Sequence, residues 1–297
     1  MTVSHLNSFL DYIRHEKKFS PHTILSYETD LTQFSDFLKN ECSINDLSEV
    51  NHLSVRSWIA QLIDSGISAK SVNRKISSLK SFYKFLLANK LIKTNPLNKI
   101  QGPKTPKKLP VFVDEAPMAD LFEKIEFEEG FEGQRDKLIL DILYQTGLRR
   151  AEICGLTEQD IDFYNLTFKV LGKRKKERIL PLSHALKRNL EAYLTVKKDK
   201  GYTNPALLVN KNTKALTAAE IYRVVKKYLG AVTTLDKKSP HVLRHTFATH
   251  LLNNGADINA VKELLGHANL SATQIYTHNT IEKLKKTYKQ AHPRSGE

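Results

Sequence analysis

The sequence predicts a mainly helical protein with a small β-sheet, an α+β fold divided into two domains. The chain has 297 residues, a length typical of two domains of ordinary size. Most segments carry apolar residues at helical spacing, whereas one stretch alternates with a period of two. Four prolines, a glycine and four lysines in residues 95–110 indicate a linker between the two parts.

The first domain is predicted to be a bundle of helices over residues 1–95. Helical spacing of apolar residues places them at residues 5–18, 20–41, 52–64 and 69–90. Ser20 before Pro21, and Ser68 ahead of the fourth segment, are residues that commonly begin a helix. The linker is expected at residues 96–111.

The second domain, residues 112–297, is predicted to combine helices with one β-hairpin. Leu166, Phe168 and Val170 alternate with other side chains, a basic turn follows at residues 172–176, and an apolar strand returns at 178–182. The predicted helices lie at residues 115–129, 134–145, 183–199, 217–229, 240–253, 257–265, 271–277 and 280–290.

The charge points to a polyanionic partner. With 46 Lys and Arg against 32 Asp and Glu, the net charge is +14, so nucleic acid is the first candidate and an inert basic surface the alternative. Cys42 and Cys154 form no C-x-x-C pair, which indicates a reducing compartment and no thiolate zinc site. Without an apolar run of membrane-spanning length or an apolar signal core, we expect a cytoplasmic protein with no membrane insertion.

Nucleotide hydrolysis is not expected. The chain has no G-x-G-x-x-G, and Gly172-Lys173 is followed by Arg174 in a hairpin turn, where a phosphate-binding loop requires Ser or Thr before a helix.

Residues 239–255 form the most informative segment. Ser239-Pro240 begins a helix, and His241 and Arg244 are expected on one face of its first turns. A phosphate there would meet the positive end of the helix dipole and a guanidinium able to bind two oxygens, although a helix start with solvated basic residues is the alternative. A metal site at His241 and His245 is disfavoured because H-E-x-x-H lacks its Glu here and Arg244 would repel a cation.

Four further blocks accompany this segment. Arg149 stands at a helix start with Glu152 one turn later, Lys173 lies in the hairpin turn, His267 ends LLGH, and Tyr276 lies in LSATQIYT. In this order and spacing the five blocks resemble the tyrosine recombinase, or phage integrase, family, and within it the Xer recombinases. The resemblance covers nearly the whole chain. It implies a helical, SAM-like core-binding domain followed by a catalytic domain, closing as a C-shaped clamp around DNA.

The resemblance also implies residue roles. Tyr276 corresponds to the nucleophile that leaves a 3′-phosphotyrosyl enzyme, and Arg149 and Arg244 correspond to the pair that binds the scissile phosphate. Arg149 is preferred over its neighbour Arg150 because the family arginine directly follows Gly-Leu. Glu152 would orient Arg149.

Lys173 corresponds to the general acid, with Lys175 or Lys176 as substitutes for it, and phosphate contact as the alternative. His241 and His267 correspond to residues that hydrogen-bond the phosphate and assist proton transfer. Packing or surface roles are expected for His245, His250 and His278. No metal and no cofactor are implied.

The partners implied are double-stranded DNA at a specific recombination site and three further subunits in a cyclic tetramer, either copies of this chain or a paralogous Xer recombinase. The last helix would dock on the neighbouring subunit, with its own domain as the alternative. Resolution of chromosome dimers at cell division, with an FtsK-type DNA translocase, is the expected process. A mobile-element integrase, a type IB topoisomerase and a non-catalytic DNA-bending protein remain alternatives.

Overall fold

The computed structural model describes residues 2–106, 110–172, 177–266 and 278–295. It divides into two compact units, Met1–Lys108 and Leu109–Glu297. Each unit has its own hydrophobic core. Within the described ranges, no helix is long and apolar enough to cross a membrane.

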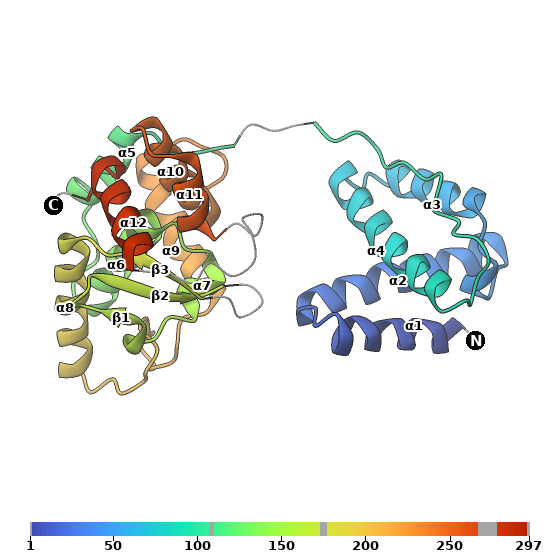
Figure 1. Ribbon diagram of the computed structural model, residues 1–297, viewed down its shortest axis with the longest axis horizontal. Coiled ribbons are helices and arrows are strands. Elements are labelled where there is room, and N and C mark those ends of the chain that lie inside the picture. The colour runs from blue at the N-terminus through green and yellow to red at the C-terminus, as the bar shows by residue number, and fades with distance from the viewer. Residues whose placement is uncertain (1, 107–109, 173–176, 267–277, 296–297) are drawn as a thin grey trace. The chain divides into compact units, whose positions relative to one another are not determined.

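The first unit is a helical bundle whose helices match the predicted ones within a few residues at most ends (Figure 1). Ser20 and Ser68 begin their helices as predicted, each accepting a backbone N–H from the residue three positions later. The first helix differs most, because it ends in a single π turn. The elements are α1 (Thr2–Asp11) with the π turn Tyr12–Glu16, α2 (Pro21–Cys42), a 3₁₀ turn (Leu47–Glu49), α3 (His52–Asp64) and α4 (Ala69–Ala88).

Aromatic side chains fill the core of the first unit. The rings of Phe34 and Trp58 lie 4.8 Å apart, and Phe82 and Tyr83 are fully buried. These rings belong to one hydrophobic core and come from α2, α3 and α4, so they pack the three helices together.

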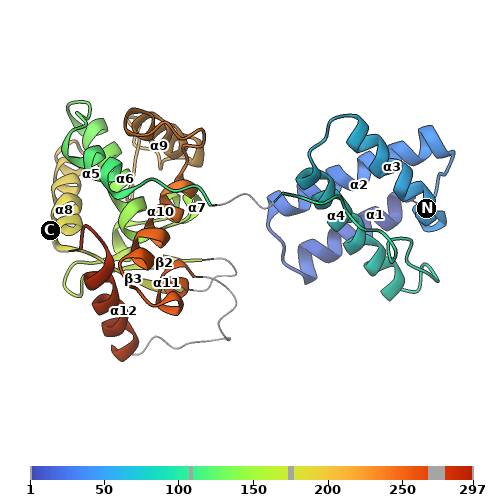
Figure 2. The same cartoon turned by 90° about the horizontal axis from the view of Figure 1, so that it is seen from above.

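In the second unit, helix α6 packs against α8, α9 and α10, and a small sheet belongs to the same unit (Figures 1 and 2). Most α6 side chains are buried, so it is a core helix rather than a surface one. Its helices are α5 (Glu115–Glu123), α6 (Phe131–Thr146), α7 (Arg150–Cys154), the 3₁₀ turn Glu158–Asp160, α8 (His184–Asp199), α9 (Ala218–Val232), α10 (Pro240–Asn253), α11 (Ile258–Leu265) and α12 (His278–Ala291).

The described sheet is antiparallel and has the order β1-β2-β3, formed by β1 (Ile161–Asp162), β2 (Thr167–Leu171) and β3 (Glu177–Pro181). The hairpin β2–β3 was predicted. Strand β1 was not, because two residues are too few to show a period. The helix start predicted at Arg149 is confirmed, since Arg149 is the N-cap of the short helix α7.

Helix α5 ends at Glu123, so the prediction that it continues to residue 129 is wrong. Beyond it, Ile125 and Phe127 alternate with acidic residues, a period of two, and both pack on the core. The ring of Phe127 lies 4.5 Å from that of Tyr228 in α9. The helix predicted at residues 271–277 lies outside the described residues.

Helix α12 packs on its own unit. Leu284 and Tyr288 are 3% and 4% exposed, and the Tyr288 hydroxyl donates to Gln145 Oε1 of α6 at 2.9 Å. In the single chain this helix therefore docks within its own domain, the alternative, and docking on a neighbouring subunit stays a prediction.

Candidate active site

Arg149 lies in a tight turn between α6 and α7. Gly147 ends α6 with φ of +60°, and a Cβ there would lie 2.5 Å from the ring of Phe247, so this position requires glycine. Arg149 then begins α7. Its backbone N–H and its Nη1 both donate to the carboxylate of Glu152, each at 2.8 Å. Glu152 thus orients Arg149, as predicted. The adjacent Arg150 is exposed.

Arg244 reaches the same turn from α10. Its side chain is buried, and its two terminal nitrogens donate to Gly147 O and Leu265 O, each at 2.6 Å. Burial, and then the charges of Arg149 and Arg178, lower the pKa of Arg244 to about 10. The guanidinium therefore remains charged at neutral pH.

The C-terminal end of α11 brings the arginines together. Arg149 Nη2 donates to Gly266 O at 3.3 Å, next to the Leu265 carbonyl that Arg244 binds. Carbonyls at a helix C-terminus lack partners within the helix and carry the negative end of its dipole. They therefore favour guanidinium groups at this position.

Arg178 belongs to the same cluster and was not predicted as a site residue. It lies on β3, donates Nη1 and Nη2 to the two oxygens of Glu152 at 2.9 and 2.8 Å, and donates Nε to Leu264 O at 3.0 Å. The sequence carried a signal for it, because position 178 alternates with the buried Leu180 and therefore faces inward. An inward-facing arginine requires a buried acceptor.

Glu152 is the carboxylate that pairs with two of these three arginines, Arg149 and Arg178. Burial raises its pKa, but the hydrogen bonds and charges of Arg178 and Arg149 outweigh burial and hold the pKa at about 2. Glu152 is therefore ionised throughout the neutral range. It positions cations and cannot supply a proton at neutral pH.

His241 is exposed near the start of α10, whereas Arg244 on the next turn is buried. The sequence placed both on one face, but their surroundings differ. His241 Nε2 lies 3.1 Å from His245 Nε2, so His245 contacts a site residue rather than only the surface. His250 packs in the core as predicted, with Nδ1 2.9 Å from the Tyr144 hydroxyl.

The remaining predicted site residues, Lys173, His267 and Tyr276, lie outside the described residues, as do Lys175 and Lys176. The side chain of His278 is also outside them. In the ranges that are described, no group of three or more His, Cys, Asp or Glu side chains is arranged to hold a metal ion.

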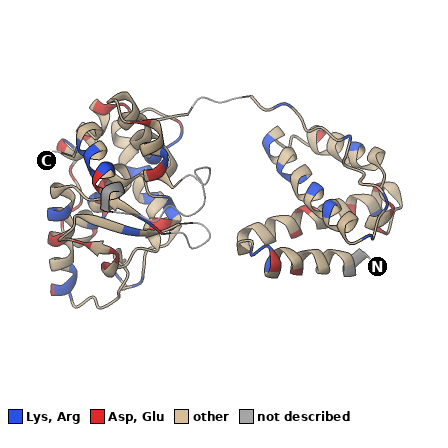
Figure 3. Ribbon diagram, in the orientation of Figure 1, with Lys and Arg blue, Asp and Glu red and all other residues tan. Residues whose placement is uncertain are grey.

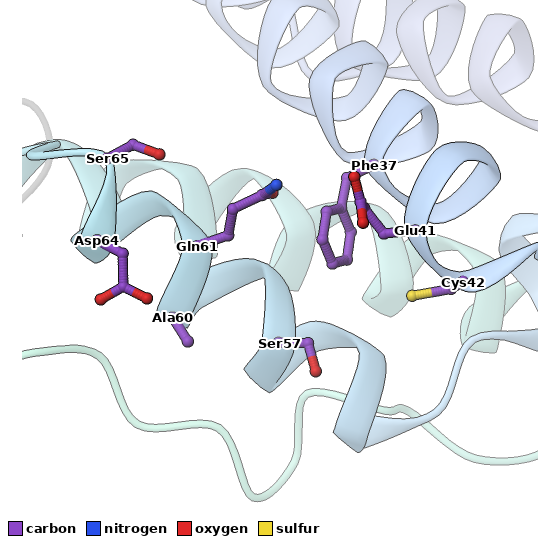
Figure 4. Close-up of a pocket in the computed structure, with 8 residues that line it drawn as sticks. All are labelled: Phe37, Glu41, Cys42, Ser57, Ala60, Gln61, Asp64 and Ser65. Atoms are coloured by element: carbon purple, nitrogen blue, oxygen red, sulfur yellow. The ribbon is translucent and has the colours of Figure 1, made fainter.

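A hollow of about 660 Å³ lies elsewhere, between α2 and α3 of the first unit (Figure 4). Its charged lining residues are Glu41 and Asp64, which would repel a phosphate. The arginine cluster is therefore the better anion site.

Two guanidinium groups held on one turn can bind the non-bridging oxygens of a phosphodiester. Each forks toward two oxygens, and both are fixed before the ligand arrives. Such preorganised positive charge stabilises a phosphorane as its negative charge grows. Arg149 and Arg244 are therefore arranged to bind a phosphate, as a phosphoryl-transfer site requires.

Comparison with known proteins agrees with this geometry. Residues 114–283 match the phage integrase family, and residues 6–90 match the phage integrase N-terminal SAM-like domain. A tyrosine recombinase XerC of Bacillus subtilis strain 168 is 38% identical over 97% of this chain and 95% of its own length. One from Staphylococcus saprophyticus is 40% identical over 97% of both chains.

Among solved structures, a post-cleavage complex of the XerH site-specific recombinase with its palindromic difH substrate has a TM-score of 0.72. It is 24% identical and covers 90% of this chain and 79% of the other. At this identity the similarity concerns the fold.

The fold and the arginine cluster define a site-specific DNA recombinase that uses a tyrosine nucleophile. The chain belongs to the phage integrase family, and its XerC relatives place it among the Xer-type tyrosine recombinases.

Proposed function

We propose that this chain cuts and rejoins double-stranded DNA at a specific recombination site and so resolves chromosome dimers before cell division. The observation that carries the catalytic part is the pair Arg149 and Arg244, both bound to the end of α11. The XerC relatives support the chromosomal part. Since its substrate would be chromosomal DNA, the protein would act in the cytoplasm.

In the proposed reaction, Tyr276 Oη attacks the scissile phosphorus while the bond to the 5′-oxygen breaks. The products are a 3′-phosphotyrosyl enzyme and a free 5′-hydroxyl. Arg149 and Arg244 stabilise the pentacoordinate state, and Lys173 gives the leaving oxygen its proton. One phosphoester replaces another of similar energy, so the exchange needs neither ATP nor water.

Two histidines complete the proposed site. His241 would hydrogen-bond the phosphate, and His267, the residue after Gly266, would assist proton transfer. A free phenol has a pKa of about 10 and is mostly protonated at neutral pH, so the site must help remove the proton from the Tyr276 hydroxyl.

The first unit would bind the duplex. Helix α4 carries four exposed cations, Lys70, Arg74, Lys80 and Lys84, and no Asp or Glu (Figure 3). Such a row of cations suits the phosphate backbone of DNA. With the catalytic unit it would form the C-shaped clamp.

We further propose a cyclic tetramer of this chain, alone or with a paralogous Xer recombinase, acting with an FtsK-type translocase. Two subunits would cut one strand of each duplex and form a Holliday junction, which the other pair resolves. Analytical ultracentrifugation on junction DNA would show four subunits per complex. Two subunits per junction at saturation would contradict the tetramer.

A nicked suicide substrate tests the chemistry. Cleavage beside the nick releases a short oligonucleotide, which prevents religation and traps the covalent complex. Wild-type protein should form a complex that survives denaturation, and Tyr276→Phe should not. If Tyr276→Phe traps DNA equally well, Tyr276 is not the nucleophile. If neither protein traps DNA, the result supports the alternative of a non-catalytic DNA-bending protein.

Chromosome-wide footprinting tests the biological role. A single site near the replication terminus supports dimer resolution. Binding at the scattered ends of elements would instead support the alternative of a mobile-element integrase.

A further inference from the structure

Three arginines bind three consecutive carbonyl groups at the C-terminal end of α11. Arg178 donates to Leu264 O at 3.0 Å, Arg244 to Leu265 O at 2.6 Å, and Arg149 to Gly266 O at 3.3 Å. Two of these arginines are the proposed phosphate ligands. The third has no role in the reaction described above.

We propose that Arg178 is a positioning residue, which fixes Arg149 and Arg244 in the geometry that binds the scissile phosphate. This inference rests on the proposed function, because it assigns Arg178 a part in the same phosphoryl transfer. Arg178 itself would not contact the DNA.

Arg178 differs from the proposed phosphate ligands because its charge is already paired, through both terminal nitrogens, with the Glu152 carboxylate, whereas the terminal nitrogens of Arg244 bind only neutral carbonyls. The side chain of Arg178 is 5% exposed, and each of its three side-chain nitrogens already donates to Glu152 or to Leu264 O. Arg149, in contrast, has a side chain that is 32% exposed. The phosphate can therefore reach Arg149, while Arg178 lies behind it on the far side of Glu152.

Arg178 holds the carboxylate that holds Arg149. Both oxygens of Glu152 accept from Arg178, and the same two oxygens accept from the guanidinium and the backbone N–H of Arg149. The carboxylate therefore has little freedom to rotate, and the Arg149 guanidinium is fixed through it. Without Arg178, Glu152 would lose two of these four hydrogen bonds.

Arg178 also holds the end of α11. Its Nε binds Leu264 O, and its Cδ lies 3.2 Å from where a Cβ on Gly266 would stand. Gly266 has φ of +63°, so both the backbone and the packing favour glycine at this position. Arg178 thus defines where the Leu265 carbonyl faces Arg244.

The positions of these residues along the chain extend the argument. Arg178 is the second residue of β3 and lies five positions after Lys173 in the sequence, and Gly266 directly precedes His267. One buried side chain therefore connects the bases of the segments that bear the proposed general acid and the proposed nucleophile with the phosphate-binding pair. A displacement of Arg178 would affect all of them together.

Single-turnover cleavage of the nicked substrate at saturating DNA tests the proposal. Arg178→Met removes the charge and the hydrogen bonds at similar length, and Arg178→Lys keeps the charge without the paired donors. We expect cleavage to fall about 100-fold in Arg178→Met, the scale of a small misplacement at a reacting centre, and about 10-fold in Arg178→Lys. DNA affinity should change less than about threefold, since the phosphate contacts remain.

Lys197→Met is the matched control. Lys197 is another buried cation of the same unit, 1% exposed, and it binds Glu158 and the carbonyls of Asn204 and Ala206. Its loss should destabilise the unit and leave cleavage per folded molecule near wild type. Equal cleavage by Arg178→Met and Lys197→Met, compared at equal folded fraction, would overturn the positioning role.

A pH profile gives a readout that general destabilisation would not move. Without Arg178, burial raises the pKa of Glu152 against the remaining Arg149 bonds alone. The pKa of Glu152 should therefore rise in Arg178→Met, so the cleavage rate relative to wild type should fall as the pH is lowered from 7 toward the ordinary Glu pKa of about 4.3, and adding Glu152→Gln should remove this dependence. A constant ratio would contradict the proposal.

The two failures remain distinguishable. Absence of any covalent complex with the wild-type protein would remove the proposed function itself. A normal wild-type complex with unimpaired Arg178→Met and Arg178→Lys would remove only the positioning role. If Arg178→Met does not fold, the comparison of Arg178→Lys with wild type carries the test alone.

Discussion

Glu152 binds Arg149 twice, through the backbone N–H and through Nη1, both at 2.8 Å. The backbone bond satisfies an N–H at the start of α7, as a capping residue does, and the side-chain bond directs the guanidinium. One carboxylate thus shapes the turn and aims the cation.

Glu152→Gln should impair both stability and cleavage. The amide cannot accept from two arginines at two oxygens, and Arg178 would remain buried without a counter-charge. We expect the second unit to lose about 3 kcal/mol in free energy of unfolding. Suicide-substrate cleavage should fall at least about 10-fold. Cleavage at the wild-type rate would show that Arg149 needs no carboxylate.

The pH dependence of this contribution follows from the pKa of about 2. That value lies below the ordinary Glu pKa of about 4.3, so the stabilisation is complete above pH 4.3 and is lost as the pH falls toward 2. Denaturant titrations at pH 7, 4 and 2.5 should therefore bring wild type and Glu152→Gln closer together as the pH decreases. A gap that stays constant to pH 2.5 would contradict the ion pair.

Long periodic elements and their capping residues were predictable from the sequence. Ser20 and Ser68 begin helices because a side-chain oxygen can accept a free N–H, a local interaction that needs no tertiary context. Strand β1 was missed because its pairing with β2, not its own pattern, forms it.

The candidate site was predictable where a motif marks it and hidden where only packing does. Arg149 and Arg244 follow from the family pattern. Arg178 depends on the β2–β3 register, which pairs it with the buried Val170, and on an α11 end that lies 86 residues later along the chain. The alternation within β3 indicates that Arg178 faces inward, but no local pattern in the sequence predicts its partner at the end of α11.

Asp30 should be essential for the stability of the first unit. It is fully buried in α2 and accepts from Lys75 Nζ at 3.0 Å and from the Ser78 hydroxyl at 2.8 Å, both of α4, and it also pairs with Arg74. Asp30→Ala leaves Lys75 buried without its counter-charge, which should cost about 3 to 5 kcal/mol.

The buried Trp58 provides the measurement. It is the single tryptophan of the chain and lies in the first unit, so its fluorescence during urea titration reports on that unit alone. Arg74→Ala is the control, because its side chain is half exposed and its pair with Asp30 should contribute at most about 1 kcal/mol. Equal losses from both substitutions would show that burial of the pair is unimportant.

Lys173→Ala should slow cleavage of an ordinary phosphodiester by about 100-fold or more if Lys173 is the general acid. A substrate with sulfur in place of the 5′ bridging oxygen has a leaving group that needs no proton. That substrate should restore the Lys173→Ala rate to near wild type. Arg149→Ala should not be rescued, since it acts on the non-bridging oxygens; without rescue of Lys173→Ala, the lysine serves only in binding.

Acid should destabilise the packing of the chain end that follows α12, through His292. The ring is buried; Nε2 donates to Tyr144 O at 3.2 Å, and Nδ1 accepts the backbone N–H of Arg294 at 3.1 Å. Protonation of Nδ1 would break its hydrogen bond with the Arg294 N–H, because a protonated nitrogen can no longer accept. Burial accordingly lowers the pKa of His292 to about 3.

The direction of the effect follows from the lowered pKa. The unfolded chain takes up a proton near pH 6.5, whereas the folded ring resists it, so stability falls as the pH decreases from about 6.5 toward 3. Denaturant titrations followed by circular dichroism at pH 7, 6 and 5 should show a smaller decrease for His292→Leu than for wild type. His184→Leu, at the start of α8, is the control and should follow the wild-type decrease. If His292→Leu also follows it, other groups carry the acid sensitivity, His250 first among them because burial lowers its pKa as well.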